Sequence, residues 1–418
     1  MKKILALVLA LCMVFALCAC GQSAAPATEA PAAEEAAPAA EDAAPAEDAA
    51  PAEEAEGEYK IAMITDYGDI TDQSFNQTTY EACKAFAEDN GVEFTYFKPA
   101  GDSTADRVAM IEKAADEGYN VIVMPGYAFG GAIVEAAPEF PDVKFIALDV
   151  GKGDLLETAV ANAGESYDYN PDNWNLDEYV DMSNVYCAIY QEELCGYMAG
   201  YAAVKLGYTK LGFLGGMEVP AVVRYGYGFV QGVDAASKEL KVKTTMNYAY
   251  GGKFEGDPDI TAAMDTWYNG GTEIVFACGG GIYTSACEAA KKVNGKVIGV
   301  DVDQKDIIDT AYGAGMTVTS AMKGLYPATY DTLKDVILNN NWKDYSGKIE
   351  TLGLVSEDVS KNYVQIPSTT QFKDGKFTMD DYKALVKKML TGDIKVSNDT
   401  TKHPDVTEVE VKYFDSIK

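Results

Sequence analysis

From residue 59 onward the chain alternates between short, continuous apolar runs and longer segments with apolar residues at helical spacing. The first block has apolar runs at residues 59–65, 93–97, 121–124 and 143–148, with helical patterns at residues 74–90, 105–117 and 130–137. The second has runs at residues 184–190, 211–214, 244–250, 273–277, 296–300 and 317–322, with helical patterns at residues 191–206, 222–237, 259–268, 283–293 and 325–338. Uniformly apolar strands are typical of parallel sheets covered on both faces. The alternation predicts an α/β protein with two doubly wound lobes.

Changes in the pattern predict the lobe boundaries. Residues 153–183 are aromatic and acidic and predict a long surface loop, and a helix at residues 380–389 precedes a polar tail. We expect an N-terminal lobe from residues 59–185 with about 325–342. We expect a C-terminal lobe from residues 186–324 with about 345–370, followed by a C-terminal helix and tail over residues 371–418.

The first 58 residues predict export and a tether. Lys2 and Lys3 precede an apolar run, residues 4–17, that is short for a membrane span. Because Cys20 follows a small residue, as in a lipobox, we expect residues 1–20 to be a lipoprotein signal peptide and Cys20 to carry lipid. A plain signal-peptidase site is the alternative. Residues 21–58 are rich in Ala, Pro and Glu, without a basic residue, and predict a disordered tether. The expected location is the extracytoplasmic face of the cell membrane.

Composition excludes several functions. The chain has 34 Lys and Arg against 65 Asp and Glu, so its net charge of −31 argues against nucleic acid. The single histidine, His403, lies in a polar segment and excludes a Ser-His-Asp triad or a multi-histidine metal site. We expect no metal and no cofactor. The five cysteines beyond the signal form no C-x-x-C pair and predict buried small apolar residues: Cys83, Cys187, Cys195, Cys278 and Cys287.

The loop after the first strand carries the parts of a binding site for a small, flat, polar molecule. Asp66 ends the strand, and Phe75, Asn76 and Gln77 open the next helix. Ligands of open α/β sheets bind outside the carboxyl ends of strands, where this loop lies. Asp72 or Ser74 can cap the helix, because a short side-chain oxygen accepts from first-turn amides.

Other strand ends carry further candidates. Asp301 ends a buried strand, where an unpaired charge is costly, and Lys323 directly follows another. The glycines 279–281 also follow a strand but lack the Gly-Lys-Ser/Thr ending of a P-loop. They predict close backbone approach to a ligand, at Gly280, or a tight turn.

Several motifs occur in one order: Asp72-Gln-Ser-Phe-Asn-Gln77, Gly126-Tyr-Ala-Phe129, Pro141 to Asp149, Gln191-Glu-Glu-Leu-Cys-Gly196 with Ala199-Gly-Tyr-Ala-Ala203, Leu211-Gly-Phe-Leu-Gly-Gly216, and Gly299-Val-Asp-Val-Asp-Gln304. In this order they resemble the basic membrane protein (BMP) family of bacterial lipoproteins, the purine-nucleoside receptors of ABC importers. The resemblance implies a type I periplasmic-binding-protein fold. In that fold, two Rossmann-like lobes are joined by three crossovers and close over a ligand.

The resemblance also implies roles for single residues. It gives Asp66 as the acceptor for the purine, Phe75 as one face of an aromatic sandwich, Asp301 as the acceptor for the ribose hydroxyls and Lys323 as the cation beside the sugar. Asn76 and Gln77 match the same motif.

The chain departs from the family at two places. Tyr127 and Phe129 occupy the region in which family members place a base-side amide, so we include both as candidate ligand contacts. The second stacking ring is open between Phe276, Tyr283 and Tyr225, of which Phe276 is our candidate.

The sequence therefore predicts a monomeric, lipid-anchored substrate-binding protein, not an enzyme, that binds a purine nucleoside and delivers it to the permease and ATPase subunits of an ABC importer. Because the base-side amide is missing, a free base, sugar or vitamin is an alternative ligand. A surface sensor without a transport role is another alternative. Asp66, Asp69 and Asp72 suggest a nucleoside hydrolase, but their spacing does not fit a tight carboxylate cluster and no proton donor is evident.

Overall fold

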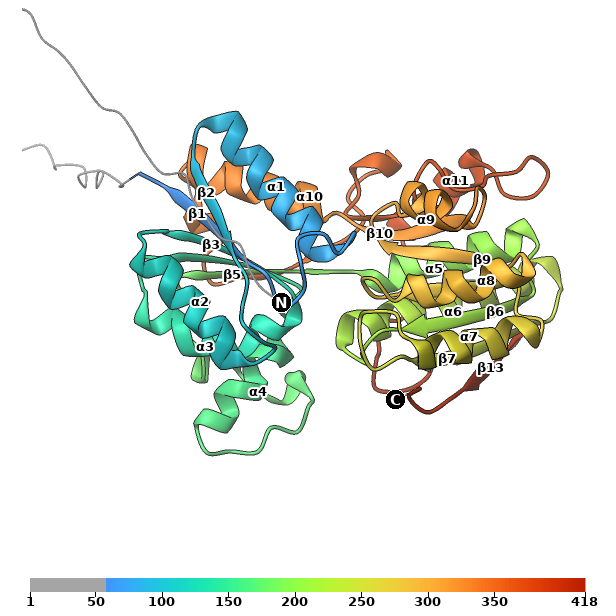
Figure 1. Cartoon of the computed structure of the whole chain (residues 1–418), viewed down its shortest axis with the longest axis horizontal. Coiled ribbons are helices and arrows are strands. Elements are labelled where there is room, and N and C mark those ends of the chain that lie inside the picture. Colours follow the sequence, from blue (N-terminus) through green and yellow to red (C-terminus); the bar gives the residue numbers. More distant parts are fainter. Residues whose placement is uncertain (1–57, 418) are drawn as a thin grey trace, which may run out of the picture. The chain divides into compact units, whose positions relative to one another are not determined.

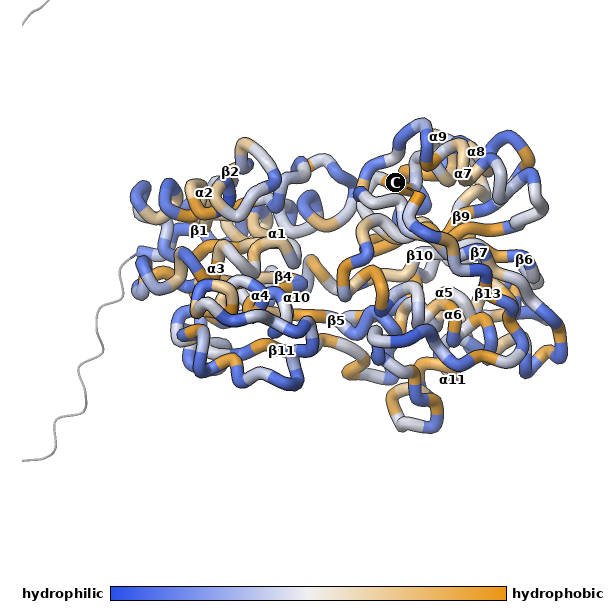
Figure 2. Tube along the Cα trace, turned by 90° about the horizontal axis from the view of Figure 1, so that it is seen from below, coloured by the Kyte–Doolittle hydropathy of each residue, from blue (hydrophilic) through white to orange (hydrophobic). Residues whose placement is uncertain are grey.

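The computed structural model describes residues 58–417. The predicted signal peptide, the lipidation site Cys20 and the tether up to residue 57 lie outside the described residues. The described part contains two largely parallel sheets with helices on both faces (Figure 1). Apolar residues follow the strands, and the outer loops are mostly hydrophilic (Figure 2). Among residues 58–417, none of the helices combines the length and the apolar character needed to cross a bilayer.

The first sheet has the strand order β11-β5-β4-β3-β1-β2 and is parallel throughout. Its strands are β1 (Lys60–Ile64), β2 (Glu93–Phe97), β3 (Val121–Pro125), β4 (Lys144–Leu148), β5 (Val185–Tyr190) and β11 (Ile349–Leu352). Its helices are α1 (Phe75–Asn90), α2 (Thr104–Asp116), α3 (Gly130–Ala136), α4 (Lys152–Asn162) and α10 (Leu325–Leu333), the last continued by a π-helical turn, Lys334–Leu338.

Both faces of the first sheet are buried, which explains its uniformly apolar strands. Ile61 and Met63 of β1 join one core with residues of α1 and α10. Ala62 and Ile64 join a second core with residues of α2 and α3. Successive side chains of a strand point to opposite faces, so only a sheet covered on both sides makes every position apolar.

The second sheet has the order β12-β10-β9-β8-β6-β7-β13, in which only β12 is antiparallel to its neighbour. Its strands are β6 (Lys210–Gly215), β7 (Thr244–Tyr250), β8 (Ile274–Cys278), β9 (Lys296–Asp301), β10 (Thr317–Lys323), β12 (Val364–Gln365) and β13 (Val409–Tyr413). Its helices are α5 (Glu192–Leu206), α6 (Pro220–Leu240), α7 (Pro258–Asn269), α8 (Tyr283–Val293), α9 (Lys305–Tyr312) and α11 (Met379–Leu390). Short 3₁₀ turns lie at Tyr127–Phe129, Ala137–Glu139, Pro171–Asn173, Leu176–Glu178, Trp342–Asp344 and Val359–Lys361.

The chain crosses between the sheets after β5, after β10 and between β11 and β12. Backbone hydrogen bonds join the crossing segments: Gln191 N donates to Leu352 O (3.0 Å), and Gly324 N donates to Tyr363 O (2.7 Å). Two doubly wound sheets joined by three crossovers form the type I periplasmic-binding-protein fold, which confirms the predicted fold class.

Two predicted segments differ from the structure. The expected surface loop at residues 153–183 begins with the helix α4, because Leu155, Leu156, Ala159 and Val160 recur at helical spacing and are buried. The remainder is irregular apart from two 3₁₀ turns. The helix was not predicted because this apolar stripe is short and the residues that follow it are aromatic and acidic.

The expected C-terminal boundaries also need correction. Residues 349–352, which we expected in the second lobe, form β11 and pair with β5 of the first sheet. The predicted polar tail contains β13, which pairs with β7. Only Val409 of β13 is fully buried, so a sheet-edge strand of this kind has little apolar signal.

Helices α5 and α6 pack backbone to backbone at glycines of both helices. A Cβ atom on Gly228 would lie 2.1 Å from Glu193 O, and one on Gly232 would lie 2.1 Å from Tyr197 O. The same holds for Gly196 and Gly200 of α5. A Cβ atom on these residues would lie 2.2 Å from Tyr225 O and 2.4 Å from Phe229 O of α6. The four glycines let the helices approach more closely than any side chain allows.

Gly228→Ala should therefore force α5 and α6 apart. We expect a loss of about 1–3 kcal/mol of unfolding free energy, the cost of overpacking a dense core, measured by urea denaturation. Gly153→Ala in α4 is the control. Its Cβ would lie 3.3 Å from the hydroxyl of Tyr167 and 4.0 Å from Cγ of Pro171, and alanine favours a helix. Equal losses in both variants would contradict the close-packing explanation.

Candidate functional site

A cavity of about 420 Å³ lies between the carboxyl ends of the two sheets. The first lobe contributes the loop after β1, the start of α1 and the residues following β3 and β4. The second contributes the start of α6, the loop after β7 and the ends of β8, β9 and β10. Seven predicted site residues line this cavity: Asp66, Phe75, Asn76, Tyr127, Gly280, Asp301 and Lys323. The topology therefore gathers residues that are up to 257 positions apart in the sequence.

The other three candidates lie away from the cavity lining. Gln77 holds its own turn, since its Oε1 accepts from Gln73 N at 3.1 Å and its Nε2 donates to Glu81 at 2.9 Å. Phe129 is fully buried in the core between β3, α2 and α3. Phe276 points toward α6, where it packs against Tyr225 and Phe229. At the end of the same strand, Cys278 lines the cavity instead.

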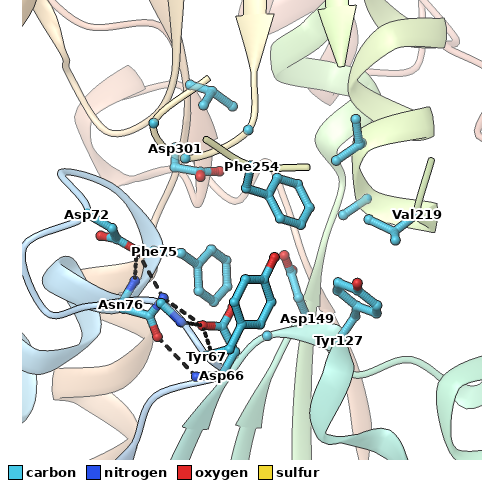
Figure 3. A pocket seen from close by; sticks show the side chains of 18 of the residues that line it. Asp66, Tyr67, Asp72, Phe75, Asn76, Tyr127, Asp149, Val219, Phe254 and Asp301 are labelled. Carbon is cyan, nitrogen blue, oxygen red and sulfur yellow. Dashed lines mark hydrogen bonds between the residues drawn. The ribbon is translucent and has the colours of Figure 1, made fainter. Parts of the chain in front are cut away.

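Two carboxylates shape the loop between β1 and α1 (Figure 3). Oδ1 of Asp66 accepts from the amides of Tyr67 (2.6 Å) and Gly68 (2.7 Å) and from Nδ2 of Asn76 (3.0 Å). Asp72 caps α1 by accepting from the amides of Ser74, Asn76 and Gln77 at 2.9–3.1 Å. Burial raises the pKa of Asp72.

With Asp72 as the cap, the hydroxyl of Ser74 is left to contact the other lobe. Ser74 Oγ donates to Asp301 Oδ2 at 2.6 Å. Gln304 Nε2 of the second lobe donates to Gln73 O at 3.3 Å. Of our two candidates for the helix cap, Asp72 fills the role, and Ser74 instead joins the lobes beside the cavity.

Lys323 is the centre of a buried ionic cluster on the cavity wall. Its ammonium pairs with Asp149 of the first lobe, with Glu192 at the first crossover (3.3 Å) and with Asp301 of the second lobe (3.7 Å). Glu192 also accepts from Arg224 Nε at 2.6 Å. The Lys323 side chain is only 3 % exposed, and it lies 4.8 Å from the ring centroid of Phe75. A buried ammonium needs such partners, because desolvation is costly.

Burial and charge shift the pKa values of this cluster in different directions. Burial raises the pKa of Asp149 to about 7, although Lys323 opposes the shift. Burial likewise raises the pKa of Asp301, against Lys323 and the Ser74 hydrogen bond. Burial also favours the neutral acid at Glu192, but Arg224 and Lys323 outweigh it and hold its pKa below the usual range. Burial opposes the charge on Lys323, but the three carboxylates raise its pKa above the ordinary value.

Asp149 and Asp301 occupy corresponding positions in the two lobes. Asp149 follows β4, the third strand of the first sheet counted from β11. Asp301 ends β9, the third strand of the second sheet counted from β12. Both have left-handed backbone conformations, with φ of 61° and 63°. Such conformations are costly for residues with a Cβ and concentrate at functional sites. The repeated sequence Asp-Val after an apolar strand, at residues 149–150 and 301–302, was the signal that could have identified Asp149.

Aromatic side chains from both lobes face the cavity (Figure 3). Phe75 and Tyr127 come from the first lobe, and Phe254 comes from the loop after β7 in the second. Tyr67 also lines the cavity, and burial raises the pKa of Tyr127 to about 12. Tyr67 and Phe254 were not among the predicted site residues. An aromatic residue shortly after a strand end, as at both positions, was the available signal.

No group of three or more His, Cys, Asp or Glu side chains within residues 58–417 is arranged to hold a metal ion. The five cysteines of this range are buried and unpaired, as predicted. The site therefore offers hydrogen-bond acceptors, one buried cation and aromatic faces. That combination suits a small organic ligand enclosed between two lobes.

A family model for PnrA-like ABC transporter substrate-binding proteins, Bmp, matches residues 59–398, and the chain belongs to this family. The ABC transporter nucleoside-binding protein BmpA of Lactococcus lactis is 28% identical over 264 residues, 59% of this chain and 65% of that protein, which is under two thirds of its length. The CD4+ T-cell-stimulating antigen of Listeria monocytogenes is 27% identical over 81% of this chain and 88% of that protein.

Solved structures support the fold. The ABC transporter solute-binding protein from Aeropyrum pernix superposes with a TM-score of 0.58 at 18% identity, covering 82% of this chain and 88% of that chain. The family consists of solute-binding proteins of transporters, so the chain is not an enzyme.

Lys323→Met should strongly destabilise the protein, because Asp149, Glu192 and Asp301 lose a shared buried counter-charge. Breaking a buried ion pair from one side costs about 3–5 kcal/mol. Lys98→Met is the control. Lys98 also lines the cavity, but it is 44% exposed and pairs only at the surface with Asp69, at 3.0 Å. We expect about 0–1 kcal/mol there. Similar urea-denaturation midpoints for the two variants would contradict the importance of the cluster.

A second prediction concerns Glu193, the neighbour of Glu192. It is 4% exposed, its Oε2 has no hydrogen-bond partner among the described residues, and burial raises its pKa to about 7. The unfolded chain releases this proton near pH 4.3. Between these values the native state binds more protons, so this carboxyl lowers the unfolding free energy as the pH rises.

Glu193→Gln should remove that dependence. We expect the variant to gain on the order of 2 kcal/mol over the parent at pH 8 and little at pH 4.5, measured by urea denaturation at both values. The same substitution at the exposed Glu157 controls for loss of one negative charge. A gain that is equal at both pH values would show that titration of Glu193 is not its cause.

Proposed function

We propose that the protein is the lipid-anchored receptor of an ABC importer and that it binds a purine nucleoside between its two lobes. The observation that carries the proposal is the joint presence, in one cavity, of aromatic faces from both lobes and of the Asp301–Lys323 pair. A nucleoside combines a flat ring with a sugar diol, so it uses both features at once. The fold alone does not define a ligand.

The aromatic features suit the base. Phe75 and Phe254 approach the cavity from opposite lobes (Figure 3). Aromatic rings stack on flat rings with modest selectivity among bases. Asp66 and Asn76 lie beside Phe75, and Asn76 with two backbone amides fixes Oδ1 of Asp66, so Asp66 can present Oδ2 to a base edge at small entropic cost.

The acidic features suit the sugar. Asp301 is the carboxylate we assign to the ribose hydroxyls, since charge-assisted hydrogen bonds are stronger than neutral ones. Lys323, 3.7 Å from Asp301, favours the ionised form and offers a donor to an oxygen of the ligand. The volume of about 420 Å³ falls in the range of small-ligand pockets.

The anchor and location follow from the N-terminal sequence. Lys2, Lys3 and the lipobox-like ending at Cys20 support attachment of lipid at Cys20 and an extracytoplasmic position. A tether over residues 21–58 then separates the binding domain from the membrane. We further propose that the monomer delivers its ligand to the permease and ATPase subunits.

A flat cationic metabolite is a second candidate ligand. Six acidic residues line the cavity against two lysines, Lys98 and Lys323, and the acidic residues are Asp66, Asp69, Asp72, Asp149, Glu255 and Asp301. This balance disfavours anions and favours a cation among aromatic faces. Thiamine, a flat cationic vitamin, is a suitable probe for this class.

The test is a thermal-shift panel of purine and pyrimidine nucleosides, free bases, ribose, hexoses and thiamine. We expect purine nucleosides to raise the melting temperature, because a ligand at about 100 times its Kd adds about 2.7 kcal/mol. Asp301→Asn should weaken nucleoside binding more than free-base binding. A shift with thiamine alone supports the second candidate, and a shift with hexoses alone rejects both.

A further inference from the structure

The ring of Phe254 packs against glycine residues that follow strands of the second sheet. The three neighbouring strands β7, β6 and β8 all end in glycine pairs or triplets: Gly251-Gly252, Gly215-Gly216 and Gly279-Gly280-Gly281. These glycines lie at the carboxyl ends of the three strands, and those after β8, Gly279 to Gly281, line the cavity. Two of the glycines, Gly216 after β6 and Gly279 after β8, lie against the ring of Phe254.

The contacts are too close for any side chain. A Cβ on Gly216 would lie 2.4 Å from Cδ1 and 2.6 Å from Cε1 of the Phe254 ring. A Cβ on Gly279 would lie 2.7 Å from the same Cδ1, and Gly279 also has a φ of 148°. Atoms this close must move apart. The Phe254 ring would move toward the cavity, because the backbone of Gly216 and Gly279 lies on its other side.

The loop that carries Phe254 is tied down on both sides. Gly251 N and Gly252 N donate to Gly215 O and Gly216 O at 2.8 Å and 3.0 Å. Glu255 pairs with Gly281 through an isolated parallel bridge. Asp257 N donates to Ser285 Oγ at 2.9 Å. If the Phe254 ring is displaced, the loop cannot move with it unless these hydrogen bonds break.

We propose that Gly216 is a specificity-determining residue: it sets how far the Phe254 ring recedes and thereby the width of the slot that faces Phe75. Glycine at position 216 lets the Phe254 ring pack against backbone, and any side chain there pushes the ring toward the cavity and narrows the slot. This inference rests on the proposed function for its ligand, whereas the coupling between Gly216 and Phe254 does not depend on a ligand.

The test is a double-mutant cycle of Gly216→Ala and Phe254→Ala. Without ligand, Gly216→Ala should lower the melting temperature by about 2–4 °C in the parent, as overpacking does, and have little effect when residue 254 is Ala. With guanosine as the probe, Gly216→Ala should weaken binding about tenfold in the parent and leave the residual binding of Phe254→Ala unchanged.

The control is Gly295→Ala. It places a Cβ 2.6 Å from the ring of Tyr268, outside the cavity lining, so it should lower stability without changing guanosine affinity. An equal thermal effect of Gly216→Ala in both backgrounds overturns the proposal, as does unchanged guanosine affinity in the parent. If no purine nucleoside binds the parent, the nucleoside assignment fails, and the thermal cycle alone decides whether Gly216 positions Phe254.

Discussion

The buried ammonium of Lys323 is the interaction on which the two-lobed arrangement depends. It ends β10 immediately before the second crossover, and its carboxylate partners come from the first lobe, the first crossover and the second lobe. Asp301 and Glu192 approach it from its own lobe and the adjoining crossover, and Asp149 adds a partner from the first lobe. The full set of carboxylates that offsets its desolvation cost therefore forms only when both lobes are present. The cost of burying this charge thus links folding of the hinge region to construction of the ligand cavity.

Residues that join the two lobes also line the cavity. Asp301 accepts from Ser74 of the other lobe, approaches Lys323 and faces the cavity. A ligand that engages Asp301 therefore enters an existing hydrogen-bond network. Preorganised acceptors of this kind bind a ligand more tightly, because little conformational entropy is lost on binding. The surrounding contacts hold both carboxylates there despite the cost of a left-handed backbone at Asp149 and Asp301.

Two aromatic residues of the cavity, Phe75 and Phe254, are held in different ways. Phe75 is carried by the first turn of α1, which Asp72 caps. Phe254 instead packs against glycine backbone at the ends of two strands, β6 and β8. The polar residues of the cavity are thus held by hydrogen bonds, and this aromatic residue is held by packing.

Sequence alone determined the fold class, because uniformly apolar strands alternating with amphipathic helices require sheets covered on both faces. It also located Asp66, Phe75, Asn76, Asp301 and Lys323, since these follow strands or open a helix, where ligands bind in such folds. It failed for Phe276, whose direction depends on which face of β8 meets α6, and for β11, whose sheet is decided by a crossover. The tertiary structure alone decided that Asp149 and Glu192 share Lys323 and that Phe254 rests on Gly216. Contacts between residues far apart in sequence arise from packing, and local patterns do not encode them.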